Sequence, residues 1–183
     1  MARLVSLNVS LPREIVWRGR RVRTAFFKKP APGPVFLSTF HLDGDGVGDP
    51  RYHGGRDKAV YLYPYEHYAF WDLELRRDDL SPGSFGENFT TEGLLEEEVR
   101  IGDVFEVGTA RVRVTQPRTP CAKLGMRMGS MAFVRRFAAS GRIGFYLAVD
   151  REGVVATGDA VTRLASDPAQ PTVADVFRQL ASG

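Results

Sequence analysis

The sequence predicts a mainly β protein with a few helices, folded as a barrel or a sandwich. Two observations predict it: short segments with strand periodicity recur along the chain, and glycine and proline separate them. The 183 residues include 19 glycines and 11 prolines, and 43% are hydrophobic, which is enough for one core. We expect one domain over residues 1–165, followed by a linker and a short C-terminal helix over 166–183.

The N-terminal half contains short segments in which apolar and polar residues alternate. A period of two is typical of a strand with one buried face. Two such segments flank a turn of arginine and glycine and predict a β-hairpin. We expect a strand at 4–9, a hairpin of 15–17 and 22–26 around Arg18-Gly19-Arg20-Arg21, a strand at 59–63, and a helix from Pro64 to Arg76.

The C-terminal half contains the clearest strand pair, 99–107 and 110–116. In the second segment apolar residues alternate with Arg111, Arg113 and Thr115, which predicts one buried and one wet face. Turn and capping residues predict the remaining elements. We expect a helix at about 130–139 with Ser130 as its cap and Gly141 as its end, a hairpin of 145–149 and 154–155 around Asp150-Arg151-Glu152-Gly153, a strand at 161–164, and a final helix opened by a capping box at 172–175.

Positive charge is concentrated in the first 29 residues. This segment has eight basic residues against Glu14 and carries a formal +7, and the remainder carries −4, within a net charge of +3. A basic segment can contact nucleic acid or an acidic partner. Aromatic residues of the kind that stack on single strands are sparse there. We interpret the segment as a solvated hairpin with arginines on its outer face, and we do not expect nucleic-acid binding.

The sequence carries no targeting or membrane signal. No apolar run approaches the roughly 20 residues that a membrane helix needs, and the first residues lack the pattern of a signal peptide. The single cysteine cannot form a disulfide within the chain. We therefore expect a cytoplasmic protein with no membrane partner, and the oligomeric state stays open.

Three stretches contain residues suited to chemistry, and the first is 48–58. Its paired glycines lie beside His53, Arg56 and Lys58, so backbone N–H groups and cations can converge on an anion. A calcium loop is excluded because Val47 and Gly54 stand where ligands belong, and the glycine spacing fails the dinucleotide fingerprint. The alternative is an irregular loop whose glycines only permit positive φ.

The second stretch is the glycine-rich turn 83–89, which contains Glu87-Asn88. An Asn side chain in such a turn can orient a ligand through its amide, or it can bond its own backbone and cap the turn. From this stretch alone, we interpret the Glu-Asn pair as a structural cap of the turn.

The third stretch, 115–124, contains Cys121 between Arg118 and Lys123. Two prolines stiffen the exit from the strand, and Cys121 opens a short helical turn. Flanking cations near a helix N-terminus favour the thiolate, which can act as a nucleophile, a sulfur carrier or a soft-metal ligand. The alternative is a buried cysteine that serves as a small hydrophobe. We favour the functional role because of the two cations, and a dyad of Cys121 with His53 stays open.

Taken in order and spacing, the three stretches resemble the MOSC domain, named for the C-terminal part of molybdenum cofactor sulfurase. They are most similar to the stand-alone bacterial branch that includes the 6-hydroxylaminopurine resistance protein, over roughly residues 3–165. The motifs are His53-Gly54-Gly55 with Ala59-Val60-Tyr61 and Tyr63-Pro64, then Gly86-Glu87-Asn88, then Gln116-Pro117-Arg118, Pro120-Cys121 and Lys123-Leu124.

The resemblance implies a MOSC-type β-barrel that binds the molybdenum–pterin cofactor. In reductase members the cysteine thiolate ligates molybdenum, and the centre cleaves N–O bonds of N-hydroxylated compounds such as N-hydroxylated purines, which detoxifies them. Carried over, Cys121 becomes the catalytic residue and the molybdenum ligand. The implied cofactor-binding residues, around the pterin phosphate and dithiolene, are His53, Lys58, Asn88, Arg118, Thr119 and Lys123.

Two other functions stay open. In sulfurase members the domain receives sulfur, so Cys121 could carry a persulfide; alternatively, the domain could bind the cofactor without catalysis. A reductase also needs electrons, and we expect a separate electron-donor protein. Members of the bacterial branch often continue into a three-helix extension, whereas this chain ends about a helix after Pro171. If that extension docks the donor, the identity of the donor here stays open.

Overall fold

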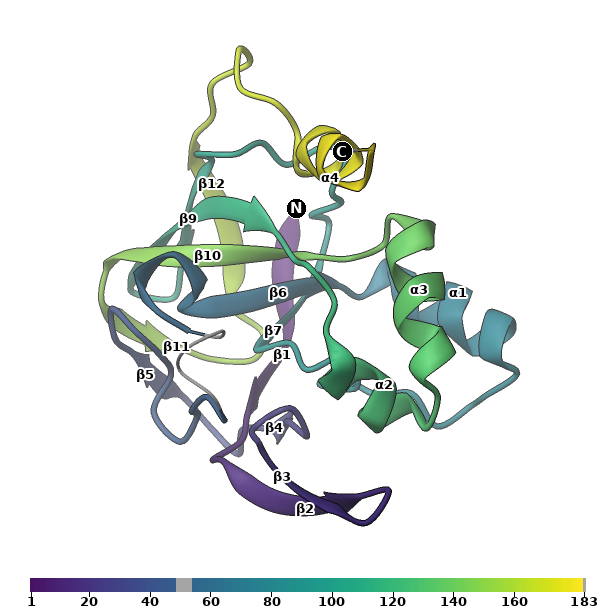
Figure 1. Ribbon diagram of the computed structural model, residues 1–183. Coiled ribbons are helices and arrows are strands. Elements are labelled where there is room, and N and C mark those ends of the chain that lie inside the picture. Colours follow the sequence, from purple (N-terminus) through teal and green to yellow (C-terminus); the bar gives the residue numbers. More distant parts are fainter. Residues whose placement is uncertain (49–53, 183) are drawn as a thin grey trace.

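The structure is a computed structural model that describes residues 1–48 and 54–182. Its elements fall into a barrel, three outlying strand pairings and a set of helices (Figure 1). The barrel strands are β1 (Ala2–Val9), β6 (Val60–Pro64), β7 (Phe89–Glu92), β8 (Val104–Val107), β9 (Ala110–Pro117), β10 (Phe145–Arg151) and β12 (Ala160–Ala165). The outlying strands are β2 (Arg13–Trp17) paired with β3 (Arg20–Thr24), β5 (Val35–Leu37) paired with β11 (Gly153–Val155), and β4 (Lys29–Pro30) paired with β1. The helices are α1 (Glu66–Leu75), α2 (Ala122–Met128), α3 (Met131–Ser140), α4 (Val173–Ser182) and the 3₁₀ turn η1 (Arg56–Lys58).

The seven barrel strands of the described chain form a closed ring. Their order is β12-β8-β9-β10-β6-β7-β1, and β1 pairs back onto β12 through Ala2 with Val161. Neighbouring strands are antiparallel except β6 and β7, which run parallel. Closure leaves no free edge along the ring. The predicted mainly β barrel with a few helices is confirmed.

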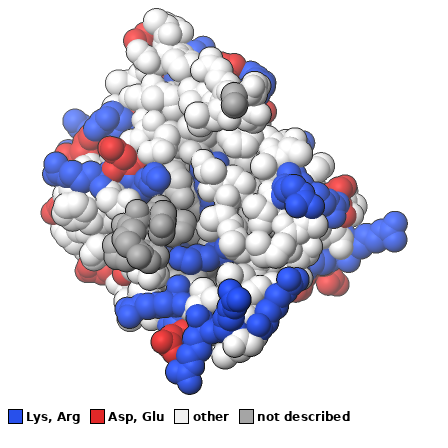
Figure 2. Space-filling view, in the orientation of Figure 1, with Lys and Arg blue, Asp and Glu red and all other residues white. Residues whose placement is uncertain are grey.

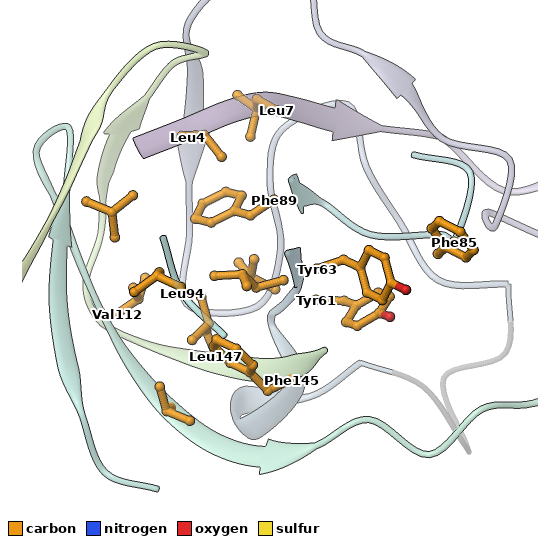
Figure 3. Packing of buried hydrophobic residues seen from close by; sticks show 14 of the residues in the cluster. Leu4, Leu7, Tyr61, Tyr63, Phe85, Phe89, Leu94, Val112, Phe145 and Leu147 are labelled. Carbon is orange, nitrogen blue, oxygen red and sulfur yellow. The ribbon is translucent and has the colours of Figure 1, made fainter. Parts of the chain in front are cut away.

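Strand alternation fills the inside of this ring with apolar side chains. In β9, Ala110, Val112 and Val114 are at most 1% exposed, as the alternation predicts. Figure 3 shows Leu4 and Phe89 pointing toward the same interior. Burying a side chain of this size stabilises the fold by roughly 1.5–3 kcal/mol before the loss of conformational entropy is counted. The barrel is therefore a packed support for whatever lies at its end.

A second, aromatic cluster joins the barrel to helices α1 and α3. The ring centroids of Tyr63 and Phe85 are 4.6 Å apart, and Phe137 of α3 stacks on Tyr63 at 5.8 Å. Trp71 of α1 donates a 2.7 Å hydrogen bond from Nε1 to the Tyr63 hydroxyl. Because α2 precedes α3 with only two residues between them, this packing also fixes α2, which begins next to Cys121.

One predicted element is wrong, and another is shorter than predicted. The hairpin of 145–149 with 154–155 does not form: β10 runs on to Arg151, and β11 pairs with β5. The chain turns away because Gly153 packs against the β8–β9 turn, where a Cβ would lie 2.5 Å from the Thr109 carbonyl carbon. The strand predicted at 99–107 begins only at Val104, because the preceding segment anchors α4: the buried Val99 carbonyl accepts a 2.8 Å bond from Val173 N.

The helix ends agree with their sequence signals in one case and differ in another. The capping box is confirmed: Asp175 N donates to Thr172 Oγ1 at 3.1 Å, and Thr172 N donates to Asp175 Oδ2 at 3.1 Å. Ser130 stands at the N-cap of α3, but its side chain makes no capping hydrogen bond. None of the helices in the described ranges is long and apolar enough to cross a membrane.

Candidate functional site

One cavity brings together residues from all three stretches that the sequence analysis selected. It encloses about 660 Å³ of space between atoms, part of it open to solvent. Its wall comes from the segment after β3, the loop before η1, the start of β6, the turn before β7 and the segment after β9. The described lining residues are Thr24, Ala25, Phe26, Lys28, Phe40, His41, Asp45, Gly46, Val47, Gly48, Gly54, Lys58, Ala59, Tyr61, Gly86, Asn88, Arg118, Cys121, Lys123 and Tyr146.

Cys121 lies on this wall at the junction of β9 and α2. It is half-buried and occupies the N-cap of α2 in an extended conformation, with φ −128° and ψ 171°. Its carbonyl accepts a 3.0 Å bond from Leu124 N, the first turn of α2. The predicted helical turn at Cys121 is therefore present, and Cys121 is one of the residues that line the cavity.

Arg118 is the most tightly held cation of the site. Its side chain is buried, and Nη1 donates a 2.9 Å bond to the Phe85 carbonyl. The guanidinium carbon lies 4.2 Å from the Tyr61 ring centroid and 5.3 Å from that of Phe26, so two aromatic faces hold it. Its Nε is buried and has no hydrogen-bond partner in the described structure. A buried donor without a partner is costly, so the carbonyl and ring contacts of the guanidinium must offset that cost.

Burial alone lowers the pKa of Arg118, but the nearby Tyr61, Tyr146 and Cys121 raise it by more. A thiolate at Cys121 attracts the guanidinium of Arg118. Burial raises the pKa of Tyr146, Arg118 opposes that shift, and repulsion between a thiolate at Cys121 and the phenolate adds to it. Cys121, Arg118 and Tyr146 thus interact electrostatically across one cavity.

Asn88 shapes the cavity wall through three hydrogen bonds. Its Oδ1 accepts from Tyr61 N at 3.1 Å, and its Nδ2 donates to the Asn8 carbonyl at 3.2 Å and to Asp45 Oδ2 at 2.8 Å. The side chain amide is buried and both of its ends are used. Asn88 therefore ties three segments together at the cavity.

The remaining predicted site residues divide into three cases. Lys58 and Lys123 are half-buried and line the cavity, and Lys58 Nζ lies 5.7 Å from the Tyr146 ring centroid. Thr119 is exposed and stands outside the set of described lining residues. His53 lies outside the residues that the structure describes.

The cavity wall also contains a buried ion pair, Lys28 with Asp45, that was not predicted from the sequence. Both side chains are 7% exposed, and Asp45 also accepts a 2.8 Å bond from Ser10 N. Burial lowers the pKa of Lys28, and its interactions with Asp45 oppose that shift. The only sequence signal was a lysine beside Phe26 and Phe27, in a segment that we interpreted as solvated.

Glu87 fixes the turn that carries Phe85. Its buried carboxylate accepts from Gly83 N at 2.7 Å, from Phe85 N at 3.1 Å and from Thr90 Oγ1 at 2.8 Å, and Tyr68 donates its hydroxyl as well. Burial raises the pKa of Glu87, and these donors oppose the shift. The carboxylate bonds inside the protein, so it sets the position of the carbonyl that holds Arg118.

The charge balance of the cavity favours an anion. Among the described lining residues, the cations Lys28, Lys58, Arg118 and Lys123 face the single carboxylate of Asp45, which is already paired. In the same part of the chain, no group of three or more His, Cys, Asp or Glu side chains is placed to hold a metal ion. A metal bound here would have to bring most of its ligands with it.

These features define a class of protein: a β-barrel with a cation-lined cavity that includes a lone cysteine. The profile of the family described as "MOSC domain" matches residues 49–162. YflK of Bacillus subtilis (strain 168) is 44% identical over 155 residues, which are 85% of this chain and 70% of YflK. The chain belongs to the MOSC domain family.

Two further comparisons bear on fold and function. The crystal structure of YiiM from Geobacillus stearothermophilus matches with a TM-score of 0.82 at 31% identity, over 98% of this chain and 84% of that one. A protein named "Reductase" from Gibberella moniliformis (strain M3125 / FGSC 7600) is 33% identical over 149 residues, which are 80% of this chain but only 26% of that protein. The predicted resemblance to the stand-alone bacterial MOSC proteins is confirmed.

The Asp45→Ala variant tests whether the buried pair supports the cavity wall. It leaves Lys28 buried without its carboxylate, which should lower the free energy of unfolding by about 3–5 kcal/mol. The matched control is Asp150→Ala, which breaks the 2.9 Å pair with Arg113, whose side chain is 45% exposed; there we expect a loss of less than about 1 kcal/mol. Urea unfolding measures both, and equal losses would show that the Lys28–Asp45 pair is not a buried interaction of this kind.

Proposed function

We propose that this protein binds the molybdenum–pterin cofactor in the cavity beside Cys121 and reduces N-hydroxylated compounds, such as N-hydroxylated purines, as a detoxifying enzyme. The observation that carries the proposal is the placement of Cys121 in the same cavity as the cations Arg118, Lys58 and Lys123. Membership of the MOSC family supports it, and so does the similarity to the Gibberella moniliformis protein named "Reductase".

The residues present fit this cofactor. Its phosphate and dithiolene groups are anionic, and Arg118, Lys58 and Lys123 supply cations that line the cavity. Molybdenum bound to dithiolene sulfur is soft, and the thiolate of Cys121 is the soft protein ligand available. The cofactor brings its own sulfur ligands to the metal and needs one ligand from the protein. The described chain has no group of three or more His, Cys, Asp or Glu that could hold a bare metal ion, which is compatible with that need. When bound, the cofactor supplies a metal centre that can exchange two electrons with a substrate.

The reduction consumes two electrons and two protons for each substrate molecule. The N–O bond breaks, one proton goes to the nitrogen, which becomes an amine, and the other goes to the hydroxyl, which leaves as water. In the cavity, burial raises the pKa values of Tyr61 and Tyr146, so both phenols stay protonated at neutral pH. The half-buried ring of Tyr146 is suited to stacking against a flat base, whereas the cations at Arg118 and Lys123 are suited to the anionic cofactor. We propose a separate protein as the electron donor, and the cytoplasm as the compartment because a single reactive thiol suits a reducing environment.

Replacing Cys121 tests the role of the sulfur. Protein made in a host that synthesises the cofactor should lose molybdenum and reductase activity in the Cys121→Ser variant, because an alkoxide or alcohol oxygen is a poor ligand for a soft metal. The change in volume is small, so the melting temperature should stay nearly unchanged. The control is Thr119→Ala on the same segment, which should keep both metal and activity because Thr119 is exposed.

Two outcomes of that experiment would contradict the reductase proposal. One is full activity and metal content in the Cys121→Ser variant. The other is a wild-type protein that gains a stable sulfur on Cys121 after incubation with cysteine and a cysteine desulfurase, as seen by intact mass, and shows no reductase activity. The second outcome would establish the sulfur-carrier alternative.

Charge removal at Lys123 separates cofactor binding from stability. Lys123→Gln should weaken cofactor binding about tenfold, or about 1.4 kcal/mol, because it removes one charge-assisted contact to an anion. Its effect on the free energy of unfolding should stay below about 0.5 kcal/mol, since the residue is only half-buried. Arg135→Gln, an exposed position on α3, is the control and should change neither quantity. Equal losses of binding and stability would mean that Lys123 is structural.

A further inference from the structure

The β2–β3 hairpin stands apart from the barrel. In the described structure its two strands pair only with each other, from Arg13 opposite Thr24 to Trp17 opposite Arg20. The connecting residues Arg18 and Gly19 have φ values of 49° and 77°, which is the geometry of a tight two-residue turn. The ribbon shows the hairpin projecting from one edge of the molecule (Figure 1). It is therefore a defined arm.

The arm carries a large excess of positive charge. It has five exposed arginines and one carboxylate, Glu14, whose Oε2 lies 3.6 Å from Arg21 Nη1 in a pair that is open to solvent. Figure 2 shows Lys and Arg side chains gathered along the edge of the molecule where the hairpin lies. Val16 is 72% exposed and Leu11 is 65% exposed, so apolar surface is interspersed with the charge. A face that serves only solubility needs neither so large an excess of one charge nor exposed apolar side chains.

The arm is continuous with the cavity wall. β3 ends at Thr24, and Thr24, Ala25, Phe26 and Lys28 all line the cavity. A second connection runs to α2, since Arg13 of the arm and Arg127 of α2 each lie 5.2 Å from the Phe27 ring centroid. A protein bound to the arm would sit next to the site that consumes electrons.

We propose that the β2–β3 hairpin is the docking surface for an acidic electron-transfer protein, which delivers electrons to the cavity across the segment 24–28. This inference rests on the proposed reductase function. Arginine pairs with carboxylates in a bidentate manner, and complementary charge speeds the encounter of two proteins that must meet repeatedly. Single-stranded nucleic acid is a poorer match, because the aromatic residue of the arm, Trp17, is covered by the Arg18 guanidinium at 5.6 Å.

The test measures binding of a flavodoxin, a small FMN protein with an acidic surface, to the full chain. Wild-type protein should bind it at about 20 mM salt and lose most of that binding at about 0.5 M, where charges are screened within a few ångströms. The variant Arg20→Gln/Arg21→Gln/Arg23→Gln should bind about tenfold more weakly at low salt. The matched control, Arg3→Gln/Arg135→Gln/Arg178→Gln, removes the same charge from β1, α3 and α4 and should stay within about twofold of wild type.

Three results would overturn the docking proposal: no binding of flavodoxin by wild-type protein at low salt, equal weakening in the two triple variants, or tighter binding of duplex DNA or of anionic lipid vesicles than of flavodoxin. The donor dithionite, which needs no docking, distinguishes this failure from failure of the reductase proposal. With dithionite, both triple variants should reduce an N-hydroxylated purine at the wild-type rate. No reduction by any of the proteins with dithionite would instead refute the reductase function.

Discussion

The candidate site depends on one buried charge, the guanidinium of Arg118. A charge taken out of water is tolerated only where partners compensate it. Here the compensation comes from the rings of Tyr61 and Phe26 and from the carbonyl of Phe85. The buried Glu87 fixes the turn that contains Phe85. One donor, Nε, is buried and has no hydrogen-bond partner in the described structure. An acidic residue that bonds inside the protein thus decides where the functional cation lies.

The closed barrel gives the other contributors fixed positions around that charge. β6 supplies Tyr61, β10 supplies Tyr146, and the exit from β9 supplies Arg118 and then Cys121. Since each comes from the end of a strand or from the segment that follows it, loops can vary the chemistry while the ring of strands keeps its register. The same logic explains the hairpin: β3 leaves its own small sheet and becomes part of the cavity wall, so an outlying surface and the site share one segment.

Local sequence signals predicted the elements that local chemistry determines. Alternation in 110–116 gave a strand with one buried face, and the capping box at Thr172 gave a helix start, because both depend on residues within a few positions. The partner of β11 could not be predicted, since it depends on the close approach of Gly153 to a distant turn. Strands of two or three residues such as β4 and β5 carry too few residues for a period to be recognised.

The site was predictable in its chemistry and less so in its geometry. Cations beside Cys121 were visible in the sequence, and the structure places Arg118 and Lys123 in one cavity with it. The burial of Lys28 was not visible, because its partner Asp45 lies in a separate loop and only the tertiary fold brings them together. The exposure of Thr119 could not be predicted either, because it lies between a strand and a helix, where no periodicity indicates which side chains face solvent.

The most direct test of the account is the set of atoms around molybdenum in the cofactor-loaded protein. X-ray absorption at the molybdenum edge counts the sulfur neighbours of the metal in wild-type protein and in any Cys121→Ser protein that retains cofactor. If Cys121 is the ligand, molybdenum in the wild-type protein has a sulfur neighbour that the variant lacks, at the distance of a metal–thiolate bond. Identical sulfur shells in the two proteins, or wild-type protein that takes up no molybdenum, would contradict the assignment of Cys121 as the ligand.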